Sequence, residues 1–319
     1  MNGAFPHLTM TQPPLDDVIL LPSLAPCEHI AGNEKFILKA FEIQKQHLTP
    51  SGKSLVDVTV DLEDGAPVGE EDNLQEIARK LLLSPENSLR QAGVRVHSFD
   101  SPHFAADIAK VVAPAKQVVS YITLPKIHSK SQLIQAWDTI QRIIPNHAIP
   151  LHVLIETPTA VREVHEIAAL PFVQVLDFGL MDYISHLGGG ISADNMRSPG
   201  QFDHQILARV KTEIAIAALS NGKIPSHNVT VDLQSPLQAE RDASRARKEF
   251  GFLRMWSIHP TQVPEIIRAM LPSTSEIEEA EKILRAGEAA QWGPTKIDGR
   301  LHDRASYRYY WSVLQRAGV

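Results

Sequence analysis

Short apolar or β-branched runs alternate with amphipathic helical patterns along most of this chain. Eight runs have the length of strands, and they lie at 18–22, 55–63, 94–99, 118–125, 151–156, 173–179, 228–233 and 254–259. The segments between them, such as 70–82 and 236–250, repeat their apolar residues with a helical period. Parallel strands joined by helical crossovers explain this order, and an eightfold alternation predicts a closed (β/α)8 TIM barrel. No G-x-G-x-x-G follows the first run, which weakens the open, dinucleotide-binding alternative.

The chain is longer than the barrel requires. We predict a barrel domain over residues 1–272, preceded by a loose proline-containing arm, and a C-terminal helical extension over 273–319. The extension holds a charged amphipathic helix, a turn at Asp298-Gly299 and an aromatic stripe, "YRYYWSVL", that is typical of helix packing. We expect it to pack on the barrel or, more favourably, on a neighbouring subunit.

Composition excludes several classes of function. The 319 residues are 43% hydrophobic and 21% charged, and their apolar runs fall short of the roughly 20 residues that a membrane span needs. A net charge of -6 with interspersed signs gives no basic patch for nucleic acid. Cys27 is the single cysteine, and the N-terminus has no signal-like pattern. We therefore expect a cytoplasmic protein that binds neither membranes nor nucleic acid.

Charged residues gather where the predicted strands end, and a β/α barrel builds its active site there. They are Asp61, Glu63, Asp64, Arg95, His97, Lys126, Glu156, Asp182 and His259. Glu156 and Asp182 follow consecutive strands, close enough to bind one ion between them. Because no zinc-type Cys/His spacing is present, their oxygen atoms indicate Mg²⁺ or Mn²⁺. Ion pairing of each acid with a nearby Lys or Arg is the structural alternative.

Two of these cations have more than one interpretation. Arg95 has the planar fork that suits a substrate carboxylate, and it is equally a partner for the acids of "DLED". Lys126 could be a Schiff-base nucleophile, but the carboxylates around it favour an ion-pair role with a high pKa. Weaker candidates are the "GGGISAD" loop at 188–194 as a phosphate cradle, and His259 as a helix cap.

Seven motifs follow one another in the order of a known family. They are "VTVDLEDGAP", "VRVHSFDSPH", "ITLPKIHS", "LIETPTAV", "FGLMDYISHLG", "SIHPTQV" and "IDGRLHDRAS". Together they resemble the HpcH/HpaI aldolase and citrate lyase superfamily, in its branch of citrate lyase β-subunits and malyl-CoA or citramalyl-CoA lyases. The resemblance implies a barrel, usually trimeric or a dimer of trimers, that uses a divalent metal to cleave a carbon–carbon bond.

The resemblance also implies roles for individual residues. Glu156 and Asp182 would hold Mg²⁺, and Arg95 would steady an oxygen at the reacting centre. Asp303 would be the acid that the C-terminal segment places over a neighbouring subunit's site, and Glu63 and Asp64 would hold Arg95 or metal-bound water. The positions that we assign to substrate binding are Arg95, Lys126, Gly179, Leu180 and Met181.

The resemblance makes a lyase our leading hypothesis, with an acyl-CoA or related thioester and a small 2-keto acid as products. Three departures put the use of CoA in doubt: "DVILLPSLAP" lacks the arginine and glycine of the family's opening strand, Met255 stands at a lysine position, and His97 replaces an asparagine. Alternatives on the same metal site are a CoA-independent 2-keto-3-hydroxy acid aldolase and a thioester hydrolase. A non-catalytic carboxylate-binding subunit is the alternative from another class.

Overall fold

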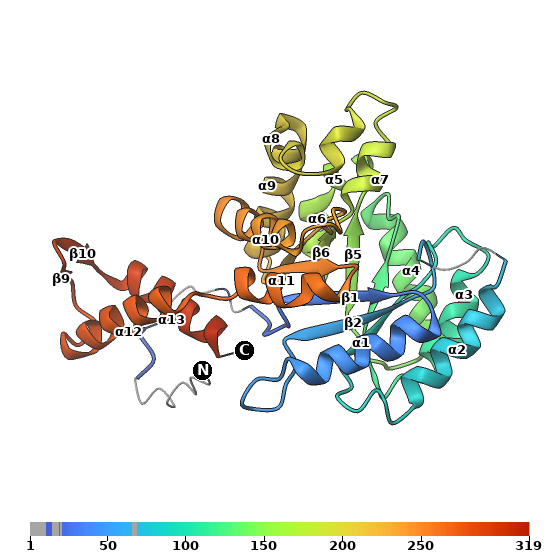
Figure 1. The fold of residues 1–319 in the computed structure, drawn as a ribbon, viewed down its shortest axis with the longest axis horizontal. Coiled ribbons are helices and arrows are strands. Elements are labelled where there is room, and N and C mark those ends of the chain that lie inside the picture. Colours follow the sequence, from blue (N-terminus) through green and yellow to red (C-terminus); the bar gives the residue numbers. More distant parts are fainter. Residues whose placement is uncertain (1–10, 15–18, 20, 66–68, 319) are drawn as a thin grey trace.

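The computed structural model describes residues 11–14, 19, 21–65 and 69–318. Within them, eight parallel strands close into a barrel in chain order, and the last strand pairs with the first (Figure 1). The barrel prediction is confirmed. The strands are β1 (Cys27–Ala31), β2 (Val56–Asp61), β3 (Ala92–Arg95), β4 (Val119–Leu124), β5 (Leu151–Ile155), β6 (Val173–Phe178), β7 (Ile224–His227) and β8 (Arg254–Ser257).

Helices surround the barrel and return the chain from the carboxyl end of one strand to the amino end of the next. The main ones are α1 (Glu34–Gln46), α2 (Glu71–Leu83), α4 (Lys130–Ile143), α9 (Gln205–Ser220), α10 (Pro236–Phe250) and α11 (Val263–Met270). Shorter helices are α3 (Phe104–Asp107), α5 (Pro158–Arg162), α6 (Val164–Ala168), α7 (Leu180–Ser185) and α8 (Gly200–Asp203). The predicted helix at 236–250 forms over that whole range and ends at Gly251, whose φ of 80° is the left-handed conformation that glycine adopts readily.

Apolar and polar residues alternate within β2. This alternation gives the barrel an apolar layer outside its strands and a polar interior. Val56, Val58 and Val60 face outward into the apolar layer beneath the helices. The residues between them face inward, where Asp57 contacts Arg254, Thr59 contacts Glu28 and Asp61 contacts Arg95. Successive side chains of a strand point to opposite faces, so this single strand supplies both the apolar layer and an unusually polar interior.

Two predicted strands were placed wrongly. The first was expected at 18–22, where Val18 and Leu20 lie outside the described residues and the other three have no regular structure. The true first strand is Cys27–Ala31, and it was missed because Glu28 interrupts its apolar pattern while pairing inside the barrel with Arg254. The seventh was expected at 228–233, but β7 comes directly before it, and Asn228 instead bonds through its side chain to Lys211 and Gln201.

The C-terminal extension is present and has its own apolar cluster. Helices α12 (Thr274–Ala289) and α13 (Arg304–Ala317) flank a hairpin of β9 (Thr295–Ile297) and β10 (Arg300–His302), and the unit projects from the barrel (Figure 1). Asp298 and Gly299 make the hairpin turn with φ values of 48° and 80°, as predicted. Tyr307 of the aromatic stripe is fully buried between the helices. No described helix has both the length and the apolar character to cross a membrane.

Candidate active site and metal centre at the barrel mouth

Arg95 and Asp61 form a buried ion pair at the carboxyl ends of β2 and β3. The two residues are register partners, and the Arg95 guanidinium donates to both Asp61 oxygens, at 2.7 and 2.6 Å. Burial alone would lower the pKa of Arg95, but the Asp61 carboxylate outweighs it and raises that pKa. The guanidinium therefore stays charged and is held in one orientation by a bidentate contact.

The loop after β2 is built around the same aspartate. Asp61 accepts hydrogen bonds from the backbone N–H groups of Glu63 at 3.1 Å and Gly65 at 2.8 Å. A Cβ atom at position 65 would lie 2.3 Å from Asp61 Oδ2, so glycine is required for this approach. As expected, Glu63 and Asp64 also form ion pairs with Arg95, at the longer distances of 3.6 and 3.8 Å from its Nη1 atom. Asp61 is the direct partner, because it shares the strand register of Arg95.

Lys126 follows β4 and connects the two sides of the mouth. Its ammonium group donates to Glu63 and, at 2.8 Å, to Asp64, while its backbone N–H donates to Glu156 Oε1 at 2.5 Å. Burial opposes the charged form, but the hydrogen bonds to Asp64 and Glu63 outweigh it and raise the Lys126 pKa. A lysine held protonated in this way is a poor Schiff-base nucleophile, so the ion-pair interpretation is the one that the geometry favours.

Glu156 and Asp182 follow the adjacent strands β5 and β6, whose last residues are register partners. Glu156 is 1% exposed, and Asp182 lies half-buried in the first turn of α7. Burial, and next the charge of Asp182, raise the pKa of Glu156 to about 8. A Cβ at Gly179 would lie 2.3 Å from Glu156 Oε2. Only glycine therefore allows the backbone after β6 to pack directly against the Glu156 carboxylate.

These two acids fit a divalent cation. A buried carboxylate that is destabilised by a second carboxylate gains most from a positive charge between the two, and no lysine or arginine forms a salt bridge with either acid among the described residues. Carboxylate oxygen atoms are ligands that Mg²⁺ and Mn²⁺ accept. The ion-pair alternative for Glu156 and Asp182 is therefore not what the structure shows.

The remaining predicted residues of the mouth are arranged around this pair. Gly179, Leu180 and Met181 lead from β6 into the first turn of α7; Leu180 is buried, whereas Met181 is 47% exposed. His97 bonds through Nδ1 to Asp107 at 2.7 Å, and His259 accepts from the Thr261 N–H and caps a short 3-10 helix. The 188–194 segment is largely exposed and lies beyond α7.

Trp256 is a mouth residue that the sequence did not reveal. Its indole N–H donates to Asp177 Oδ1 at 2.7 Å, and the Arg95 guanidinium lies over its ring at 5.8 Å from the centroid. Tryptophan within an apolar run normally indicates packing, so only the inward register of β8 could have distinguished this role.

Asp303 lies far from this mouth in its own chain. It is exposed and caps α13, accepting from the backbone N–H groups of Ala305 and Ser306. The extension begins where α10 and α11 end, near the Arg247–Glu276 ion pair, and so at the amino ends of the strands. Any catalytic role of Asp303 therefore requires the mouth of another subunit.

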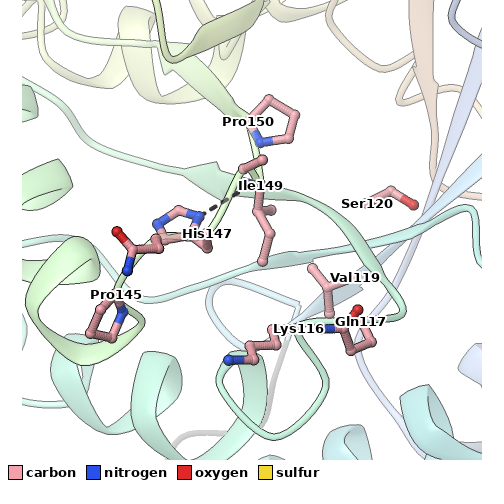
Figure 2. Close-up of a pocket in the computed structure, with 10 residues that line it drawn as sticks. Lys116, Gln117, Val119, Ser120, Pro145, His147, Ile149 and Pro150 are labelled. Carbon is pink, nitrogen blue, oxygen red and sulfur yellow. Dashed lines mark hydrogen bonds between the residues drawn. The ribbon is translucent and has the colours of Figure 1, made fainter.

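A surface pocket also occurs at the opposite end of the barrel. Figure 2 shows its lining residues, which come from the segments that lead into β4 and β5, including Lys116, Ser120, Pro145 and Pro150. His147 accepts from the Ile149 N–H at 3.1 Å within this lining. None of the predicted site residues lines it, so we assign it no part in the chemistry of the mouth.

A β/α barrel with two acids and a fixed arginine at the carboxyl ends of its strands has the layout of the barrel enzymes. The family model for HpcH/HpaI aldolase/citrate lyase matches residues 53–225. The chain belongs to this family, and it is a carbon–carbon lyase of the citrate lyase β-subunit-like type.

Characterised relatives agree with that assignment. The L-malyl-CoA/beta-methylmalyl-CoA lyase of Rhodobacter capsulatus is 25% identical over 283 residues, which cover 82% of this chain and 86% of the relative. The citrate lyase subunit beta-like protein of Mycobacterium tuberculosis is 26% identical over 261 residues, with 82% and 87% covered.

Solved structures extend the likeness to nearly the whole chain. A citrate lyase from Burkholderia xenovorans LB400 is 43% identical, has a TM-score of 0.87, and is matched over 96% of this chain and 95% of that one. The CitE protein of M. tuberculosis, solved in complex with magnesium, acetoacetate and coenzyme A, shares the fold with a TM-score of 0.71 at 23% identity over 92% and 98% of the chains.

Proposed function

We propose that this protein is a Mg²⁺-dependent lyase that cleaves a 3-hydroxyacyl thioester, such as a malyl-CoA- or citramalyl-CoA-like substrate, into an acyl-CoA and a small 2-keto acid. The observation that carries the proposal is the pair Glu156 and Asp182 after the adjacent strands β5 and β6, where burial and the charge of Asp182 raise the pKa of Glu156 to about 8. Mn²⁺ satisfies the same donor set. The magnesium and coenzyme A bound to the M. tuberculosis CitE protein support the choice of metal and thioester.

Glu156 and Asp182 would hold the cation, which would supply Lewis-acid stabilisation of negative charge on the substrate oxygen atoms. Arg95 is fixed by Asp61 and presents its Nη1 side toward Glu63 at 3.6 Å. It stabilises the negative charge that develops on the thioester carbonyl oxygen as the enolate leaves. Gly179, Leu180 and Met181 would orient the keto-acid half through the first turn of α7.

Proton transfers at both ends of the broken bond complete the reaction. Burial raises the pKa of Glu63, so we assign it as acceptor of the hydroxyl proton, while hydrogen bonds from the Lys126 ammonium and the Asp64 backbone N–H keep it in place. The enolate carbon gains a proton from Asp303 of a neighbouring subunit, which requires a trimer or hexamer in which the extension covers the next mouth. In the opposite direction the same groups perform the condensation.

The Met255 departure and the missing glycine do not argue against CoA, whereas the family's arginine is absent from β1 as well. Met255 is fully buried in the apolar layer beneath the helices, so a lysine there would not reach the mouth of this chain. The first strand of the barrel lies after the segment "DVILLPSLAP". β1 is Cys27–Ala31 and is followed by Gly32, where a Cβ would lie 2.2 Å from the Gly65 carbonyl oxygen.

The direct test is cleavage of malyl-CoA and citramalyl-CoA, with the free hydroxy acids as the comparison, in Mg²⁺ and after EDTA treatment. We expect Mg²⁺-dependent release of acyl-CoA and 2-keto acid, and a loss of turnover of about 1,000-fold or more in Glu156→Gln, since the metal site then loses a charged ligand. Turnover that survives EDTA, or cleavage of the free acids alone, would contradict the proposal.

Asp303 is tested by mixing two inactive variants. Subunits that carry Asp303→Asn are mixed with an equal amount of subunits that carry Glu156→Gln, unfolded together and reassembled. The mixture should regain about a quarter of the wild-type activity, because random assembly places an intact mouth beside an intact neighbouring extension at that frequency. Each variant reassembled alone is the control. If the mixture stays as inactive as its components, Asp303 does not act across the subunit interface.

A further inference from the structure

A second group of metal-ligand side chains lies inside the barrel, away from the mouth. Glu28 of β1, His152 of β5 and Asp177 of β6 are each at most 1% exposed. One ligand atom from each lies within 4.8 Å of the others. None of the three is Glu156 or Asp182, so the group is distinct from the metal centre described above.

The hydrogen bonding of His152 leaves one ring nitrogen free to act as a ligand. Nε2 lies 3.2 Å from Gln174 Oε1, an oxygen that can only accept, so Nε2 carries the hydrogen. Nδ1 then presents a lone pair, and it faces Glu28 Oε2 at 3.9 Å. Tyr121 stacks on the imidazole at 3.9 Å between centroids and fixes its plane. A histidine whose outer nitrogen is held in this way is the usual arrangement of a metal ligand.

Four buried side-chain atoms on the neighbouring strands β4 to β7 lack partners. Among the described residues, His152 Nδ1, Asp177 Oδ2, Ser226 Oγ and Thr123 Oγ1 have no hydrogen-bond partner. Asp177 and Ser226 are register partners between β6 and β7, and Thr123 and His152 are register partners between β4 and β5. Leaving such atoms unsatisfied costs free energy, so the unpartnered atoms of His152 and Asp177, which lie in the same cluster, point to something positive or hydrogen-bearing beside them.

The charges of the interior do not balance either. The carboxylates of Glu28, Asp57 and Asp177 surround Arg254, which donates to Glu28 Oε2 at 2.7 Å and to Asp57 Oδ2 at 2.5 Å. Two negative charges are left over in this group of described residues. Burial, and next the Glu28 carboxylate, raise the pKa of Asp177. A divalent cation would neutralise the group, whereas a proton would neutralise only part of it.

We propose that Glu28, His152 and Asp177 form a buried structural site for a divalent transition-metal ion, with Ser226 Oγ positioned as a fourth ligand. An imidazole nitrogen beside two carboxylates suits Zn²⁺ or Mn²⁺ better than Mg²⁺, which selects oxygen ligands. Because the site is closed to solvent, the ion enters as the barrel folds, and it stabilises the fold without taking part in the reaction at the mouth. The inference does not depend on the proposed function.

The test is metal content measured by mass spectrometry on the full, untagged chain produced with Zn²⁺ and Mn²⁺ in the medium and dialysed against EDTA. We expect about one ion per chain to be retained, both in the wild type and in Glu156→Gln/Asp182→Asn, because the sealed site exchanges slowly while the mouth releases its metal. His152→Gln should lose this ion. A correctly folded His152→Gln protein that retains the ion would overturn the proposal.

A measurement on the wild type keeps the proposal testable if His152→Gln does not fold. X-ray absorption at the edge of the retained metal should show one imidazole nitrogen together with carboxylate oxygens, and refolding with Zn²⁺ should give a higher Tm than refolding in EDTA. A wild-type protein that folds fully, contains no metal after either treatment and has one Tm would show that protons and water satisfy the group instead.

Discussion

The barrel mouth and the barrel interior are built from the same kinds of side chains but differ in access to solvent. At the mouth, Arg95 is paired with Asp61, and it is 8% exposed. In the interior, Arg254 is paired with Glu28 and Asp57, and it is fully buried. An ion pair that a substrate can reach contributes to chemistry, whereas a sealed one contributes only to the stability and shape of the fold. The difference teaches that residue type alone does not identify a catalytic arginine.

The sharpest way to test this contrast is to replace each arginine by methionine. Arg254→Met leaves the buried Glu28 and Asp57 uncompensated, and we expect it to lower the free energy of unfolding by about 3–5 kcal/mol. Arg95→Met should cost less stability, since Asp61 keeps two backbone donors, but it should lower kcat by about 100- to 1,000-fold.

Urea unfolding and lyase assays on both variants give the comparison, with Arg→Lys at each position as the charge-retaining control. Two variants with the same loss of stability and the same loss of turnover would show that the mouth and the interior do not divide these roles.

The pH dependence of stability should separate the mouth from the interior as well. Glu156 has an ordinary pKa of 4.5 when unfolded and about 8 in the folded protein. Between these values the folded state binds more protons, so the free energy of unfolding falls as pH rises from about 5 to 8, by up to about 4 kcal/mol. Mg²⁺ should reverse this loss, because it binds the deprotonated carboxylate.

Urea unfolding at pH 5 and pH 8, with and without Mg²⁺, measures the effect, and Glu156→Gln is the matched control that removes the titrating group. If the pH dependence of stability persists unchanged in Glu156→Gln, another carboxylate causes it. The buried Asp177, whose pKa is also raised, is then the next candidate.

The sequence predicted the barrel and the charged residues at its strand ends, because an apolar run followed by a charged residue marks the end of a strand. Glu156 and Asp182 each follow an apolar run, so the register of the barrel brings them together without any long-range information. Glu28 and Arg254 are different: Glu28 is the second residue of β1 and Arg254 the first residue of β8, and a charged residue at such a position normally predicts exposure to solvent. Only their pairing across β1 and β8 makes either position compatible with burial, and pairing is not visible in one sequence.

The same limit explains why the sequence could not say which acid of "DLED" lies closest to Arg95. Asp61, Glu63 and Asp64 stand within four residues, and the sequence offers no means of ranking them. The ladder between β2 and β3 decides, because it places Asp61 opposite Arg95 and leaves the other two acids on the loop beside Lys126.

The smallest effect that we predict concerns Trp256, which contacts both regions. Trp256→Phe keeps a ring beneath Arg95 but removes the N–H that donates to Asp177 Oδ1, so it should destabilise the fold by about 1–3 kcal/mol with little change in kcat. Trp256→Leu removes the ring as well and should also lower kcat, since Arg95 then loses the aromatic ring against which its guanidinium packs. If the two variants lose equal turnover, the indole ring does not position Arg95, and the interior and the mouth are connected only through the backbone of β8.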